Sequence, residues 1–82
     1  MTKEEFRKLK LSGRYTELKS SGVYLASRDF NGYFVHLFSL NDFYVEVWIL
    51  IGLGQIRWIE IQENKSQIDL YVDKLDLGNL FS

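Results

Sequence analysis

Apolar residues dominate the middle of the chain and fall into short runs separated by turn-forming residues. Most of residues 33–62 are β-branched, aromatic or leucine, which is typical of strands. Asn31-Gly32, Asn41-Asp42 and the Gly52-Leu53-Gly54 segment interrupt the runs where turns are expected. The pattern predicts four antiparallel strands joined in sequence: Val23–Arg28, Tyr33–Leu40, Phe43–Ile51 and Gln55–Gln62.

Two helical segments are expected before this sheet. Thr2 and Glu5 have the spacing of a capping box, which predicts a short helix over residues 3–10. A second helix is predicted over residues 14–20, with Ser12 as a cap and Gly22 as a left-handed residue at its end. A strand over residues 14–19 is the alternative, because Tyr and Thr also suit strands.

One helix is expected after the sheet. Asn64 and Ser66 supply capping side chains, and a single apolar stripe follows at helical spacing. We therefore predict a helix over residues 66–75, after which Leu80 and Phe81 fold back onto the core. The chain is predicted to be one α+β domain, residues 1–82: a four-stranded antiparallel meander with one or two N-terminal helices and a C-terminal helix packed on one face.

The alternation of side chains predicts the pairing of the strands. A three-residue loop at residues 52–54 sets Trp48 opposite Trp58 and Glu46 opposite Glu60, whereas a one-residue slip would move the apolar set to the wrong face. The same parity in the preceding hairpin, with a loop at residues 40–42, sets His36 opposite Glu46. In the first hairpin Asn31-Gly32 favours a two-residue loop, but parity favours a three-residue loop at residues 30–32.

These registers predict a sheet with two unlike faces. The aliphatic face, which the helices should cover, carries Val23, Leu25, Val35, Leu37, Val45, Val47, Ile49, Ile59 and Ile61. The aromatic face carries Tyr24, Arg28, Phe34, His36, Phe38, Tyr44, Glu46, Trp48, Trp58, Glu60 and Gln62.

Three interpretations of the aromatic face remain open. Another part of the chain can cover it as ordinary core, it can bind a partner protein or a second copy of the chain, or it can hold a pocket for a small ligand. Rings with a few charges are the composition of interface centres, which favours a non-enzymatic interaction module and a possible homodimer. The interface residues are then Tyr24, Arg28, Phe34, His36, Phe38, Tyr44, Trp48 and Trp58.

The ligand-pocket interpretation has an enzymatic form. His36, Glu46 and Glu60 would form one row across three strands, with side chains about 5 Å apart. Such a row is capable of general acid–base chemistry, with Arg28 beside a developing negative charge. His36 can equally serve only to relieve the repulsion between the two carboxylates, and we expect a chain that is not an enzyme.

Composition narrows the classes of function. The 82 residues include no cysteine and one histidine, so we expect no disulfide, no thiolate nucleophile and no structural zinc site. Two carboxylates and a histidine can hold a divalent cation, but no spacing in the sequence specifies one, and we expect no metal and no cofactor. Ten basic residues against eleven acidic ones argue against a nucleic-acid partner. The most apolar stretch, residues 45–53, is too short to span a membrane, and the N-terminal residues are not a secretory signal. A cytoplasmic protein is expected.

Several segments together resemble one group of proteins. These are residues 22–28, Gly32-Tyr33, residues 43–48, Ile59-Glu60, and the ending with Leu75-Asp76-Leu77 and Leu80-Phe81. They resemble small, uncharacterised single-domain proteins of Bacteroidetes-type bacteria, and the resemblance spans most of the chain. It implies a bacterial, cytoplasmic, single-domain protein and attaches no activity or functional residue to it.

Overall fold

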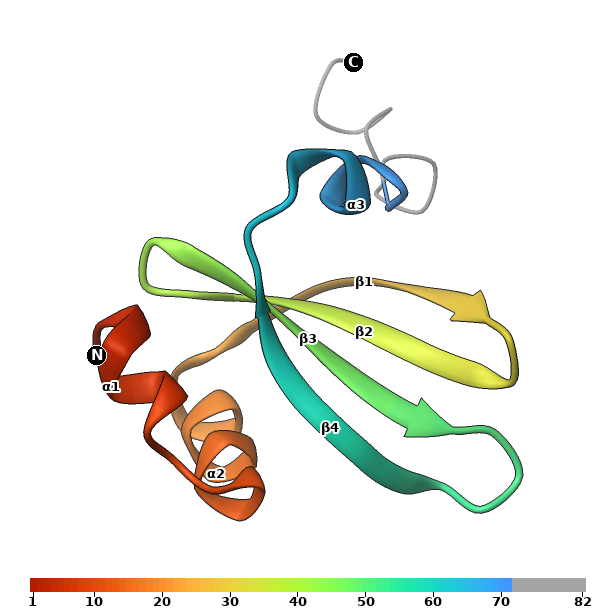
Figure 1. Ribbon diagram of the computed structural model, residues 1–82, viewed down its shortest axis with the longest axis horizontal. Helices are drawn as coiled ribbons and strands as arrows, with labels where there is room; N and C mark the ends of the chain where they lie inside the picture. The colour runs from red at the N-terminus through yellow and green to blue at the C-terminus, as the bar shows by residue number, and fades with distance from the viewer. Residues whose placement is uncertain (72–82) are drawn as a thin grey trace.

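The computed structural model describes residues 1–71 of the 82-residue chain. Two helices precede four strands, and a short helix follows them (Figure 1). The elements are α1 (Lys3–Arg7), α2 (Leu11–Ser21), β1 (Val23–Phe30), β2 (Tyr33–Leu40), β3 (Phe43–Leu50), β4 (Gln55–Gln62) and α3 (Lys65–Asp69).

The predicted α+β fold with a four-stranded antiparallel meander is confirmed. The strands lie in the order β1-β2-β3-β4, so β1 and β4 form the two edges of an open sheet. Helices α1 and α2 lie together at one side of the sheet, and α3 lies across the sheet from them (Figure 1). Ile68 of α3 and Tyr71 pack on the face opposite to α1 and α2, so the helices do not all cover one face as predicted.

The predicted register of β3 and β4 is confirmed over most of its length. Trp48 pairs with Trp58 and Glu46 pairs with Glu60. The connection differs from the expected three-residue loop, because residues 51–54 form a four-residue turn and the register shifts after Trp48. The shift leaves Arg57 as an extra residue in β4, and this bulge restores the pairing that the longer turn would otherwise displace.

The predicted register of β2 with β3 is wrong by one residue, and so is that of β1 with β2 between Ala26 and Phe30. An irregularity after Tyr24 returns Val23 and Tyr24 to the predicted pairing. Both turns are two-residue loops, Asn31-Gly32 and Asn41-Asp42, with positive φ at Asn31 (46°), Gly32 (86°) and Asn41 (54°). Residues that tolerate positive φ allow the tightest hairpin turns, and turn geometry fixes the register in a hairpin. As a result His36 pairs with Val47, and Leu37 pairs with Glu46.

These registers redistribute the side chains of β1 and β2 between the two faces. The face that carries Val45, Val47 and Ile59, covered by α1 and α2, is called the helix face here. The opposite face, which carries Glu46, Trp48 and Trp58, is called the tryptophan face. Contrary to prediction, the tryptophan face also holds Val35 and Leu37, and the helix face holds Tyr24, Phe34, His36 and Phe38.

The main core lies between the helix face and the two N-terminal helices. Phe6 of α1 and Leu18 of α2 are buried against the sheet, and Phe6 meets Phe43 edge-on at 5.9 Å between ring centroids. Arg14 of α2 donates to the carbonyl oxygens of Ile59 (2.6 Å) and Arg7 (2.8 Å), so one guanidinium joins α2 to both β4 and α1.

The helix predictions are confirmed in type and corrected at their ends. The Thr2–Glu5 capping box is present, but α1 ends at Arg7. Residues 14–20 are helical, and α2 begins at Leu11, before Ser12, with no side-chain cap. Gly22 is extended (φ −79°) and not left-handed; a Cβ there would lie 2.7 Å from the carbonyl oxygen of Leu18, which is what requires glycine.

Helix α3 begins at Lys65, one residue before the predicted start, and the Asn64 side chain caps it as expected by accepting from the amide of Ser66 at 2.9 Å. It ends at Asp69 and is followed by the buried Tyr71. The remainder of the predicted helix, residues 72–75, and the predicted contact of Leu80 and Phe81 lie outside the described residues.

Candidate functional site

A buried carboxylate lies at the centre of the tryptophan face. Glu46 of β3 is fully buried in a strand whose other inward residues are apolar. Its Oε2 accepts from the Tyr71 hydroxyl at 2.6 Å, and its Oε1 accepts from the Gln62 amide at 2.7 Å. Since a buried carboxylate without partners is strongly destabilising, these donors are what allow Glu46 to stay inside.

Arg28 of β1 completes this polar cluster. Its Nη2 lies 3.6 Å from Oε2 of Glu46, and its side chain is only 10% exposed. The guanidinium carbon lies 5.3 Å from the ring centroids of both Phe30 and Tyr71, and 5.8 Å from that of Trp48. The ion pair is therefore shielded from water by three aromatic rings, which also attract the cation.

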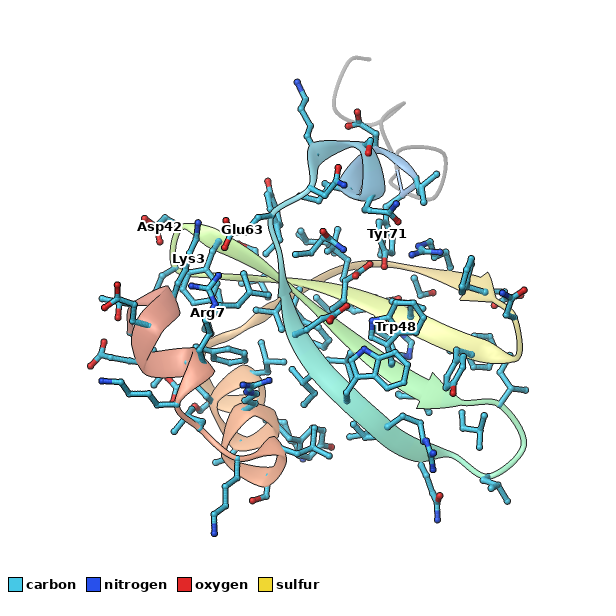
Figure 2. The ribbon with its side chains drawn as sticks, in the orientation of Figure 1. Lys3, Arg7, Asp42, Trp48, Glu63 and Tyr71 are labelled. Carbon is cyan, nitrogen blue, oxygen red and sulfur yellow. The ribbon has the colours of Figure 1, made fainter. Side chains whose placement is uncertain are left out.

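Tyr71 connects the end of α3 to this cluster, and it points toward the sheet in Figure 2. Burial is the largest cause that raises the pKa of the Tyr71 hydroxyl far above its usual range, and the hydrogen bond to Glu46 adds to it. The phenol therefore stays protonated at physiological pH and acts as a donor to the carboxylate.

Four aromatic rings extend from Arg28 across the same face. Trp48 and Trp58 are stacked with ring centroids 4.8 Å apart, and Tyr33 contacts both of them at 5.7 and 5.4 Å. Phe30 meets Trp48 edge-on at 5.9 Å. Phe30 (46% exposed) and Trp58 (37% exposed) present much of their surface to solvent. We call Phe30, Tyr33, Trp48 and Trp58 the aromatic cluster.

The predicted acid–base row is wrong. His36 lies on the helix face opposite Val47, whereas Glu46 lies on the tryptophan face. Glu60 pairs with Glu46 but is exposed, so the two carboxylates lie in different environments. The structure therefore does not bring His36 together with either glutamate, and no acid–base pair forms from these three residues.

The eight predicted interface residues are divided between the two faces. Arg28, Tyr44, Trp48 and Trp58 lie on the tryptophan face, and Tyr24, Phe34, His36 and Phe38 lie on the helix face. The latter four contact one another through their rings, with Tyr24 5.6 Å from both His36 and Phe38. Only the first group shares a face with the aromatic cluster, and Trp48 and Trp58 belong to that cluster.

His36 lies at the wall of a pocket between α2 and the sheet. The pocket has a volume of about 220 Å³, and its lining residues are Tyr15, Leu18, Lys19, His36, Phe38, Val47, Ile49, Gly54 and Ile56. The Nδ1 atom of His36 is buried and has no hydrogen-bond partner within residues 1–71. Burial lowers the pKa of the imidazole, so His36 is neutral at physiological pH.

A polar hollow lies where α1, the start of β3 and α3 approach one another. Its lining includes Lys3, Asp42 and Glu63, which Figure 2 places together at this end of the sheet. Glu63 pairs with Arg7 and lies 3.9 Å from the Lys3 ammonium. These exposed charges pair with each other and link α1 to the segment before α3. The charged residues at the hollow therefore have a structural role.

Tyr71 is a central residue that the sequence did not assign to the site. The available signal was Glu46 itself, an acid inside an otherwise apolar strand, which requires buried donors. The spacing along the chain does not identify those donors, because Tyr71 lies 25 positions away from Glu46.

Comparison with protein-family models, with curated proteins and with solved structures found no match for this chain. The resemblance to small proteins of Bacteroidetes-type bacteria stays a prediction. Within the described residues no helix has the length and apolar character needed to cross a membrane. In the same part of the chain no three His, Cys, Asp or Glu side chains are grouped as metal ligands.

Proposed function

We propose that this chain is a non-enzymatic, cytoplasmic interaction module that self-associates through the tryptophan face. The observation that carries the proposal is the aromatic cluster, in which Trp58 and Phe30 remain exposed although they contact other rings. Tryptophan and tyrosine are the side chains most enriched among residues that dominate binding energy.

The aromatic cluster rests on buried side chains, which suits it to binding a partner. Trp48 packs against the buried group of Val35, Leu37 and Tyr71, and its ring lies over the Arg28 guanidinium. Side chains held in one conformation before binding lose little entropy when a partner arrives. In this proposal the buried Glu46–Arg28 pair supports the aromatic cluster structurally and has no catalytic role.

A second copy of the chain is the occupant that this surface fits. A patch of rings is self-complementary, since aromatic side chains pair with copies of themselves across a two-fold axis. A standard interface covers about 800 Å² on each partner, which is about one seventh of the 5603 Å² of accessible surface on this chain.

Sedimentation velocity over a range of concentrations tests the proposal. The wild-type chain is expected to form a dimer, and Trp58→Ala is expected to weaken it roughly 30-fold or more, as for a central interface residue. Tyr24→Ala is the matched control, because it removes a more exposed aromatic ring (53%) from the helix face. A wild-type monomer at high concentration, or an equal effect of both substitutions, would contradict self-association through this face.

A further inference from the structure

The pocket between α2 and the helix face is a second candidate site, and it does not depend on the proposed dimer. The tryptophan face carries the aromatic cluster, whereas this pocket lies on the opposite side of the sheet. Its volume of about 220 Å³ is below the ~300–1,000 Å³ typical of pockets for drug-sized ligands. It therefore fits a compact molecule with one ring or one branched aliphatic group.

The floor of the pocket is apolar. Leu18 of α2 and Val47 of β3 are buried, and Phe38, Ile49 and Ile56 are partly buried around them. These side chains come from one helix and three strands, so the floor is fixed by the main core. An apolar body placed there would exchange water contacts for packing, which is the main source of affinity in such pockets.

The polar side chains of the lining are few and include one full positive charge. They are Tyr15, Lys19 and His36. The Lys19 ammonium lies 5.4 Å from the ring centroid of Tyr15, one helical turn away, and makes no salt bridge within residues 1–71. A cation held beside an apolar cavity recognises a ligand that combines an anionic group with an apolar body.

The environment of His36 agrees with this chemistry. Its ring is enclosed by Tyr24, 5.6 Å away, and by Phe34, which stacks on it at 6.4 Å. A neutral imidazole still carries one N–H, so it adds a hydrogen-bond donor to the wall without adding a second charge. The lining thus provides one cation, one neutral ring donor and a phenol around an apolar floor.

We propose that this pocket binds a small carboxylic acid with an apolar body, aromatic or branched aliphatic, whose carboxylate pairs with Lys19. The apolar body contacts Phe38, Ile49 and Ile56, and the carboxylate lies at the mouth beside α2. The acid is held as a ligand and is not transformed.

Phenylacetate is a suitable probe, with phenylacetamide and acetate as matched compounds. In an NMR titration of the full chain, phenylacetate is expected to shift the amide signals of Lys19, His36, Gly54 and Ile56. Phenylacetamide lacks the charge and acetate lacks the ring, so each should bind at least about tenfold more weakly. The indole signals of Trp48 and Trp58, which lie on the other face, should not move.

Two substitutions separate the charge from the cavity. Lys19→Gln should weaken phenylacetate binding about tenfold, whereas Lys10→Gln removes the same charge from an exposed position outside the pocket and should leave it unchanged. Ile56→Phe should abolish binding by filling the cavity, and if that variant does not fold, the Lys19 pair alone decides.

Several outcomes would overturn the pocket assignment. These are no shifts at the pocket signals, equal binding of phenylacetamide, or an equal loss in both lysine variants. The dimer test is separate, because Trp58→Ala should give a monomer that still binds phenylacetate. A chain that binds phenylacetate but never dimerises would refute only the proposed function.

Discussion

At the scale of single residues, the stability of the molecule depends on the partners that compensate the burial of the Glu46 carboxylate. Its carboxylate is fully buried and receives the Tyr71 hydroxyl, the Gln62 amide and the Arg28 charge. Removing one partner from such a group costs more than the partner contributes as an isolated hydrogen bond, because the remaining charge keeps its desolvation penalty.

Tyr71→Phe should lower the free energy of unfolding by about 1–3 kcal/mol, because it removes a donor from a buried carboxylate and leaves the ring in place. Urea unfolding at pH 7 measures the loss. Tyr44→Phe, which removes the hydroxyl of an exposed tyrosine, is the control and should change little. Equal stability of Tyr71→Phe and the wild type would mean that the hydroxyl does not support Glu46.

Tyr71→Phe should also change how the free energy of unfolding depends on pH under alkaline conditions. The pKa of Tyr71 is raised in the folded chain, so above about pH 10 the unfolded state loses a proton that the folded state keeps. Wild-type stability should therefore fall as the pH rises above about 10, and this contribution should be absent in Tyr71→Phe.

His36 should weaken the fold in mild acid. Burial lowers its folded pKa, so below the unfolded value of about 6.5 the unfolded state binds a proton that the folded state excludes. Stability should decrease as the pH falls below that value and level off below the folded pKa. The titratable groups around it are Lys19 and Tyr15 of α2 and Tyr24 of β1, and the residues that line its pocket include no aspartate or glutamate.

NMR titration of the single histidine measures this directly, and a pKa at or above 6.5 would contradict the expectation. Unfolding at two pH values, compared with His36→Phe, isolates the contribution of His36 from those of the carboxylates. The difference between the two proteins should grow in favour of the variant as the pH falls.

At the scale of elements, replacing glycine by alanine should have opposite effects on stability at two positions of α2. Gly13 is helical, and an added Cβ would meet Leu9 at an ordinary distance of 3.4 Å. Gly22 ends the helix, and there an added Cβ would lie 2.7 Å from the backbone oxygen of Leu18. Backbone cannot move aside as a flexible side chain can.

Gly13→Ala should therefore stabilise the chain by up to about 1 kcal/mol, because alanine loses less conformational entropy in a helix. Gly22→Ala should destabilise it, because the link from α2 to β1 must shift. Thermal unfolding of the two variants beside the wild type shows in one experiment which substitution stabilises the chain and which destabilises it. A stabilising Gly22→Ala would show that the close approach at the helix end is easily relieved.

At the scale of the whole molecule, the sequence determined the fold class but only part of the site. The capping box, the four strands and the opposition of Trp48 to Trp58 followed from local pattern. The faces of β2 could not be predicted in this way. Val35 and Leu37 place apolar side chains on one side of the strand, and Phe34 and Phe38, with His36 between them, place rings on the other. A strand that is apolar on both sides does not define its register by burial, so the two asparagine turns decided it.

That one-residue difference changed the functional interpretation. It places His36 on the face opposite to Glu46 and Glu60, in the lining of an apolar pocket that Lys19 also lines. It also placed Val35 and Leu37 beneath Trp48, so that the tryptophan face has its own buried foundation. The two hydrogen-bond donors and the ion-pair partner of Glu46 come from three different segments, and contacts of that range are not encoded in local spacing.

The hydrogen bond between Glu46 and Tyr71 also couples the end of the described chain to the closure of the tryptophan face. The two residues are 25 positions apart in the sequence. A conformation in which residue 71 is undocked while the rest of this face is closed would bury a carboxylate that lacks one of its partners, a cost of about 1–3 kcal/mol. We therefore expect the tryptophan face to close and to open together with the docking of residue 71.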